Sequence, residues 1–188
     1  MPHDDRSAGT ARAPGPSRQD DQVRAGLDRA GVLVRQITTA LAAAGHTVAA
    51  AESLTGGRLA TALADAPGAG ETFLGGVVAY ATGLKTTLLH VDASLLADAG
   101  AVHPEVAVQM AEGIRTITGA TYGLATTGVA GPAPQDGRPV GTVYVAVATP
   151  HTTSTTQPAP PSNRREDIQG EAVLAALGLL HDLLRPGG

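Results

Sequence analysis

The segment AESLTGG, residues 51–57, places a carboxylate, two hydroxyls and a glycine pair between an apolar segment and a predicted helix. Ser53 can act as a nucleophile if a neighbouring base accepts its proton. A second segment of this kind is TTGVAGP, residues 126–132, which also follows an apolar run. Glycines in such turns let backbone N–H groups approach a ligand, and a following helix favours a phosphate or an oxyanion. Turns of this kind also occur with no function, so both segments are candidates only.

A base for Ser53 has to come from the histidines or the lysines. The six histidines show neither a triad motif nor a metal-ligand spacing such as HExxH, and the GxSxG motif of α/β-hydrolases is missing. Among the 13 lysine and arginine residues, Lys85 is the single lysine. A desolvated lysine can lose its proton, whereas an arginine cannot, and Ser–Lys pairs are a known form of activated nucleophile. A bias toward arginine can also leave one stray lysine, so composition suggests Lys85 without requiring it.

The composition of the 188 residues excludes several classes of function. The chain has no cysteine, hence no disulfide or thiolate site, which fits the cytoplasmic location that we expect. A formal net charge of −4 leaves no basic field for nucleic acid. No apolar run approaches the roughly 20 residues of a membrane span, and neither a metal nor another cofactor is expected. With 43% hydrophobic but only 2% aromatic residues, the core must consist of closely packed Ala, Val and Leu.

Strands alternate with helices along the chain, which is typical of an α/β domain with helices on both faces of the sheet. Hydrophobic patterns predict strands at 47–51, 73–80, 122–125 and 140–148, with an edge strand at 152–157. Helices are predicted at 32–44, 58–65, 82–89, 92–100, 104–117 and 164–184, the last capped by Asn163. An antiparallel pair within 140–157 makes the sheet mixed. Residues 1–25, rich in Pro, Gly, Ser and charge, are expected to form a disordered tail before one domain at 26–186.

Five segments in order resemble the CinA C-terminal domain family: AESLTGG, FLGGVVAYATGLK (73–85), GAVHPEVAVQMAEG (100–113), TTGVAGP and RPVGTVYVA (138–146). The resemblance extends from about Val32 to Leu184, and the family's characterised members are nicotinamide-nucleotide amidohydrolases. It implies an α/β fold, namely a three-layer α/β/α sandwich with a mixed, mostly parallel sheet, in a homo-oligomer. It also implies that the carboxamide of nicotinamide mononucleotide is hydrolysed to nicotinate mononucleotide and ammonia.

The resemblance places the nucleophile at Ser53 and the accompanying tyrosine, lysine and threonine at Tyr80, Lys85 and Thr127. In this interpretation Lys85 is the base, Tyr80 holds it or relays a proton, and Thr127 binds the oxyanion or orients the serine. Seven further residues are expected to contact the nucleotide: Glu52, Thr55, Gly56, Gly57, Gly128, Gly131 and Arg138. For Glu52 a structural hydrogen bond is an equal alternative. We expect the 5′-phosphate on backbone N–H groups of the glycine turn, or else on one of the arginines Arg58, Arg138, Arg164 and Arg165.

The chain departs from the family pattern at Leu54, Thr82, His103 and the segment APQDGR, residues 133–138. Two alternatives therefore stand beside the amidohydrolase hypothesis. The altered segment suggests an amidase for another carboxamide, and the family's association with competence suggests a non-catalytic nucleotide-binding or interaction module. Full-length CinA proteins carry an additional N-terminal nucleotide-binding domain. Since only the predicted tail precedes Val32 in this sequence, we expect the activity of that domain to be absent.

Overall fold

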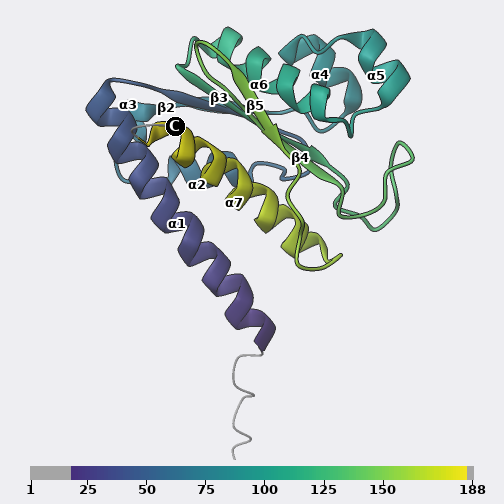
Figure 1. Cartoon of the computed structure of the whole chain (residues 1–188), viewed down its shortest axis with the longest axis horizontal. Coiled ribbons are helices and arrows are strands. Elements are labelled where there is room, and N and C mark those ends of the chain that lie inside the picture. Colours follow the sequence, from purple (N-terminus) through teal and green to yellow (C-terminus); the bar gives the residue numbers. More distant parts are fainter. Residues whose placement is uncertain (1–17, 186–188) are drawn as a thin grey trace, which may run out of the picture.

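A single five-stranded sheet forms the centre of the molecule. The structure is a computed structural model that describes residues 18–185. Its strands lie in the order β2-β1-β3-β4-β5, and Figure 1 shows the sheet between α4 and α6 on one side and α1 and α7 on the other. β1 pairs in parallel with β2 and β3, whereas β4 is antiparallel to both β3 and β5. The strand bounds are β1 Val48–Glu52, β2 Phe73–Val78, β3 Tyr122–Gly128, β4 Val143–Ala148 and β5 Thr153–Thr156.

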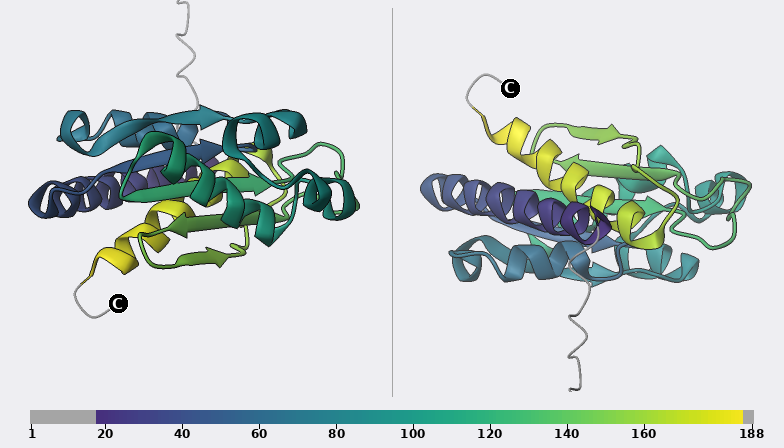
Figure 2. Two further views of the ribbon diagram at one scale, coloured as in Figure 1. Left: turned by 90° about the horizontal axis from the view of Figure 1, so that it is seen from above. Right: turned by 90° about the horizontal axis from the view of Figure 1, so that it is seen from below.

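Helices cover both faces of this sheet (Figure 2). On one face lie α1 (Arg18–Ala44), α2 (Arg58–Ala64) and α7 (Arg165–Leu184), with the short α3 (Ala69–Thr72) beside α1. On the other face lie α4 (Thr82–Leu89), α5 (Ala93–Ala99) and α6 (Pro104–Thr118). The predicted α/β class, with a mixed sheet between two helical layers, is therefore confirmed. Parallel and antiparallel pairs occur in equal number.

The two faces of the sheet differ in side-chain size. Alternation along β1 directs Val48 and Ala50 toward α1 and α7, and Ala49 and Ala51 toward α6. The α6 side is also lined by small residues of β3 and β4, so α6 packs very close to the sheet. A Cβ built on Gly123 of β3 would lie 2.1 Å from the carbonyl oxygen of Ala111 in α6. Close approach of backbones thus supplies the packing that aromatic side chains supply in other cores.

Most predicted elements are confirmed, and the differences lie mainly at their ends. The first helix begins at Arg18, within the segment 1–25 that was expected to form the tail, and residues 1–17 lie outside the described part of the chain. The fourth strand begins at Val143 and not at residue 140, because residues 139–142 form a turn closed by the Thr142 N–H and the Pro139 carbonyl. The sequence analysis did not predict α3.

Caps fix the ends of two helices near the site. The side chain of Asp92 accepts the N–H of Ser94 at 2.7 Å, as predicted for α5. Asn163 does not cap α7; instead the hydroxyl of Ser162 accepts the N–H of Arg164 at 3.1 Å.

Among the helices within residues 18–185, none combines the length and apolar character that a bilayer crossing requires.

We predict that Gly113→Ala in α6 destabilises the protein, because the added Cβ would lie 2.0 Å from the carbonyl oxygen of Leu89 at the end of α4. Overpacking of this kind costs about 1–3 kcal/mol of unfolding free energy, measurable by urea denaturation. The matched control is Gly178→Ala in α7, where nothing lies within 4 Å of the new Cβ. This control should leave stability unchanged or raise it by up to about 1 kcal/mol. Equal effects of the two substitutions would contradict the close α4–α6 packing.

Candidate active site

The carboxyl ends of β1, β2 and β3 meet at one edge of the sheet, because the three strands run in parallel. Strand pairing continues just past them: the N–H of Ser53 donates to the carbonyl of Thr126 at 3.0 Å, and the N–H of Ala79 donates to that of Glu52 at 2.8 Å. The residues that follow each strand are therefore fixed relative to one another. Open α/β sheets bind ligands at this edge.

Ser53 and Lys85 form the contact that the sequence suggested. The Nζ of Lys85 lies 3.0 Å from the Oγ of Ser53 and donates to the carbonyl of Ala79 at 2.8 Å. Lys85 belongs to α4, whose first turn follows β2, and its side chain is 1% exposed. Ser53 is 8% exposed, so its hydroxyl lies at the boundary between the core and solvent. An amine at this distance can accept the proton of a serine hydroxyl when the amine is neutral.

Burial changes the acid–base behaviour of Lys85. Desolvation lowers the pKa of its amine from 10.5 to about 8, against an opposing effect of the Asp136 carboxylate, which raises the pKa. No carboxylate within residues 18–185 forms a salt bridge with this amine. A substantial fraction of the side chain is therefore neutral near pH 8, and the neutral amine has a lone pair that can accept the serine proton.

A cavity of about 80 Å³ adjoins Ser53. Arg165, which lines the cavity, is hydrogen-bonded to two other lining residues. It donates one N–H to the hydroxyl of Tyr80 at 3.2 Å and another to the carbonyl of Gly131 at 3.1 Å. Tyr80 is 59% exposed and makes no hydrogen bond with Lys85, so the structure places it at the mouth of the cavity and not beside the base. The lining residues are Ser53, Leu54, Tyr80, Gly128, Val129, Ala130, Gly131, Ala133, Gln135 and Arg165.

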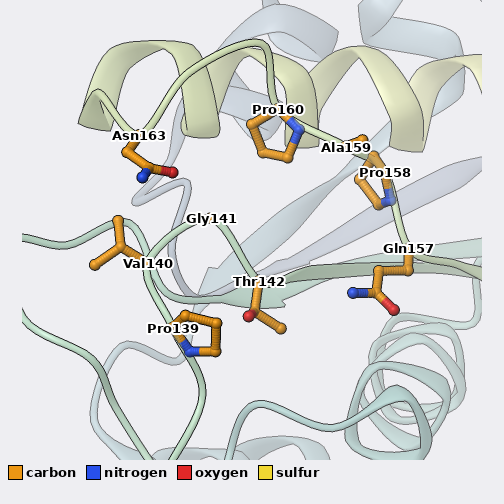
Figure 3. Close-up of a pocket in the computed structure, with 9 residues that line it drawn as sticks. All are labelled: Pro139, Val140, Gly141, Thr142, Gln157, Pro158, Ala159, Pro160 and Asn163. Carbon is orange, nitrogen blue, oxygen red and sulfur yellow. The ribbon is translucent and has the colours of Figure 1, made fainter.

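A larger hollow of about 360 Å³ lies apart from these residues (Figure 3). It is bounded by the 139–142 turn and by the proline-rich connection between β5 and α7. No residue of its lining carries a titratable side chain: the lining consists of Pro139, Val140, Gly141, Thr142, Gln157, Pro158, Ala159, Pro160 and Asn163. It can therefore supply neither a base nor an activated nucleophile, and the smaller cavity is the candidate active site despite its size.

The glycine turn does not offer its N–H groups to a ligand as predicted. The N–H of Gly56 donates to the carbonyl of Ser53, and that of Gly57 donates to the carboxylate of Glu52 at 2.9 Å. Glu52 also accepts the N–H groups of Leu59 and Ala60 at 3.1 and 2.8 Å, and it is 1% exposed. The carboxylate of Glu52 thus occupies the N-terminus of α2, where an external anion was expected. The sequence analysis left two roles open for Glu52, and these contacts are those of the structural role.

Three other predicted site residues also contact the protein itself. The hydroxyls of Thr55 and Thr126 share a hydrogen bond of 2.7 Å in the core. Thr127 donates its hydroxyl to the carbonyl of Ala101 at 2.7 Å and makes no hydrogen bond with Ser53 or Lys85 within the described chain. Arg138 does not line the cavity; its backbone closes a small hairpin with Gln135. The cationic wall of the cavity is supplied by Arg165 instead.

Gly128 and Gly131 do line the cavity, and each has a packing requirement. A Cβ on Gly128 would lie 2.4 Å from the carbonyl oxygen of Thr142, so only glycine allows β3 to approach that turn. Gly131 has φ +80°, a backbone conformation that favours glycine. These glycines shape the site rather than react in it.

Sequence analysis overlooked a buried amide that holds the residue after the nucleophile. Gln169 of α7, 4% exposed, donates to the carbonyl of Leu54 at 2.6 Å and accepts from the Nε of Arg58 at 3.0 Å. Its position within the apolar face of α7, directly after Ile168, was a signal for a buried polar contact. Through this contact α7 fixes the backbone next to Ser53.

Comparisons with known proteins found matches over most of the described chain. The model of the CinA C-terminal domain matches residues 31–184. A CinA-like protein from Frankia casuarinae is 51% identical over 138 residues, 73% of this chain and 32% of that relative. One from Synechococcus sp. is 46% identical over 137 residues, 72% of this chain and 33% of that relative. The chain thus spans about a third of the length of these curated relatives.

Two solved structures have the same fold. The competence/damage inducible protein CihA from Agrobacterium tumefaciens matches with a TM-score of 0.79 and 31% identity, over 84% of this chain and 96% of that chain. A competence-damaged protein (CinA) superfamily protein from Klebsiella pneumoniae matches with a TM-score of 0.78 and 33% identity, over 82% and 97% of the two chains. The agreement covers nearly the whole of both solved chains.

We predict a pH-dependent stability that Lys85→Met removes. Between about pH 8 and 10.5 the unfolded chain holds a proton on Lys85 that the folded protein has lost, so the free energy of unfolding rises with pH. Relative to Lys85→Met, which keeps the volume of the side chain, the wild type should gain about 3 kcal/mol across this window. Denaturant unfolding at pH 7 and pH 10.5 measures the difference. A difference that stays constant with pH would show that the pKa of Lys85 is not lowered.

Proposed function

Because the chain belongs to the CinA C-terminal domain family, we propose that it hydrolyses the carboxamide of nicotinamide mononucleotide to nicotinate mononucleotide and ammonia. The observation that carries this proposal is the 3.0 Å contact between the Oγ of Ser53 and the Nζ of Lys85. The amine is buried and has a lowered pKa, and the serine that it contacts lines a cavity. Acyl transfer needs these features of a nucleophile and its base.

In the first step Lys85 accepts the proton of Ser53 while the serine Oγ forms a bond with the amide carbon. The carbonyl π electrons move to the oxygen and give a tetrahedral oxyanion. When the oxyanion collapses, the carbon–nitrogen bond breaks, and the Lys85 ammonium donates its proton to the departing nitrogen, which leaves as ammonia. Water then attacks the resulting ester while Lys85 accepts a proton from the water. The ester bond breaks, which releases nicotinate mononucleotide and restores the serine.

The N–H of Leu54 is the first candidate to stabilise the oxyanion. It belongs to the residue directly after Ser53, lines the cavity with that residue and makes no hydrogen bond within residues 18–185. Gln169 holds the carbonyl of Leu54, which fixes the orientation of this turn. A preorganised donor of this kind is worth on the order of 3 kcal/mol of the barrier. Leu54 therefore takes the role that the sequence analysis gave to the glycine turn and Thr127.

We assign the 5′-phosphate of the nucleotide to Arg165. Its guanidinium stands at the mouth of the cavity, where it is fixed by the Tyr80 hydroxyl and the Gly131 carbonyl. The cavity of about 80 Å³ accommodates the carboxamide end of a nucleotide rather than the whole molecule, so the ribose phosphate must extend outward past these two side chains. An arginine fixed in this way presents its remaining N–H groups to a phosphate.

One observation favours a second candidate, an amidase for another carboxamide. Ala133 and Gln135, from the segment that departs from the family pattern, line the cavity. They contact whatever part of the substrate surrounds the amide, so they can change its identity without changing the chemistry at Ser53.

A homo-oligomer stays part of the proposal. β2 is an edge strand, and both β2 and α4 carry exposed apolar side chains, namely Leu74, Val78, Leu84 and Leu88. Such a surface is typical of an interface between copies, and sedimentation velocity of the purified chain tests it.

Ser53→Ala and Lys85→Arg are each expected to lower kcat for ammonia release from nicotinamide mononucleotide by at least about 10³-fold. Alanine removes the nucleophile, and a guanidinium cannot accept a proton near neutral pH. Calorimetric binding of the mononucleotide should persist in Ser53→Ala. If the wild type binds the mononucleotide but releases no ammonia from it, the chain is a binding module, and if it prefers another amide, the second candidate holds.

Arg165→Gln should raise KM for nicotinamide mononucleotide by about tenfold or more, since a hydrogen bond to a charged group contributes about 1.5–3 kcal/mol. KM for nicotinamide riboside, which lacks the phosphate, should change much less. Arg164→Gln is the matched control: this neighbouring arginine is 43% exposed and pairs with Glu166. If Arg165→Gln raised KM equally for both substrates, Arg165 would not be the residue that binds the phosphate.

A further inference from the structure

The segment between Gln135 and Arg138 is a small hairpin and not an irregular loop. The two residues exchange backbone hydrogen bonds of 3.1 and 2.8 Å. Asp136 and Gly137 between them have φ +51° and +70°, which are the conformations of a two-residue type I′ turn. Asp-Gly is one of the residue pairs that favour this turn. The altered segment therefore has a defined shape that presents one acidic side chain at its tip.

Asp136 fastens this tip to the connection between α5 and α6. Its Oδ2 accepts the N–H of Ala101 at 2.7 Å, and the carbonyl of Ala101 accepts the hydroxyl of Thr127 at 2.7 Å. Gly100 makes room for the carboxylate, because a Cβ on it would lie 2.5 Å from the Cβ of Asp136. Ala101 is thus held from both sides, and the hairpin, β3 and the start of α6 become one rigid unit.

The same carboxylate acts on the base of the candidate site. Its negative charge raises the pKa of Lys85 and so opposes the effect of burial. It is the one charged group whose field shifts this pKa within the described chain. The other titratable or charged groups on or next to the elements around Lys85 are Glu52, Tyr80, His90, Asp92, Asp98, His103, Glu105, Glu112, Arg115 and Arg165.

We propose that Asp136 is a positioning residue for the reaction: it holds the Gln135–Arg138 hairpin against Ala101 as a wall of the cavity and supplies the negative charge that acts on Lys85. This inference rests on the proposed function of the Ser53–Lys85 pair. It gives the hairpin two separable roles. The hydrogen bond to Ala101 fixes where Gln135 stands in the substrate cavity, and the charge sets the pH range in which Lys85 is neutral.

Asp136→Asn separates these roles, because the amide oxygen can still accept the N–H of Ala101 while the charge is removed. Since the charge favours the ammonium, its loss makes Lys85 lose its proton at lower pH. The acidic limb of kcat/KM should move down by about half a pH unit or more, so that activity at pH 7 rises about two- to threefold. KM should stay close to that of the wild type. A residue with only a structural role would not raise activity.

Lys85 can be observed without an activity assay. Because it is the single lysine of the chain, labelling with [¹³Cε]lysine gives one side-chain signal whose shift follows its titration. The midpoint should fall in Asp136→Asn and stay unchanged in Asp182→Asn, a matched loss of charge at a side chain that is 74% exposed. An unchanged midpoint in Asp136→Asn overturns the electrostatic role. This readout remains decisive if the protein hydrolyses no amide, so failure of the inference and failure of the proposed function are distinguishable.

Two further variants test the position of the hairpin. Asp136→Ala removes the hydrogen bond, and Gly100→Ala displaces the hairpin while it keeps the charge. Both should raise KM about fivefold or more, while Asp136→Asn should not. If Asp136→Ala does not fold, Gly100→Ala still decides the point. Wild-type KM in the folded variants would overturn the positioning role.

Discussion

The site depends on one buried amine that has no carboxylate partner in contact with it. Lys85 is 1% exposed, and its partners within the described chain are the hydroxyl of Ser53 and the carbonyl of Ala79, both neutral. An ammonium in such surroundings loses its hydration without gaining an ion pair, so burial favours the neutral form. The fold thereby places an amine with a lowered pKa beside a serine hydroxyl, and the charge of Asp136 opposes this lowering.

Small residues make this burial feasible. α6 and the end of α4 approach so closely that Gly113 has no room for a Cβ against Leu89, and Gly123 has none against Ala111. Because Lys85 lies on α4, this packing sets the position of its amine relative to β1. A core poor in aromatic residues thus lets the backbones of α4, α6 and β3 pack closely against one another.

The positive N-terminus of α2 already binds an anion of the protein itself, the carboxylate of Glu52. Glu52 occupies the N-terminus of α2 with three N–H contacts, which removes the glycine turn as a phosphate site. Its buried carboxylate instead locks the turn that presents Ser53. The cationic side chain in the cavity lining is Arg165, which comes from α7 and donates to Tyr80 across 85 residues of sequence.

The sequence determined the α/β class and most elements within a few residues, because strand and helix periodicities are local. It suggested Lys85 as the single lysine of the chain, and the resemblance to a family paired this lysine with Ser53. The sequence could not determine which polar groups are already satisfied. Thr127, Arg165 and Asp136 contact residues that are distant in the chain. Glu52 directs its carboxylate to the start of α2 and not to the cavity. Only tertiary packing decides such contacts, since a donor or acceptor serves whichever partner the fold brings within 3 Å or so.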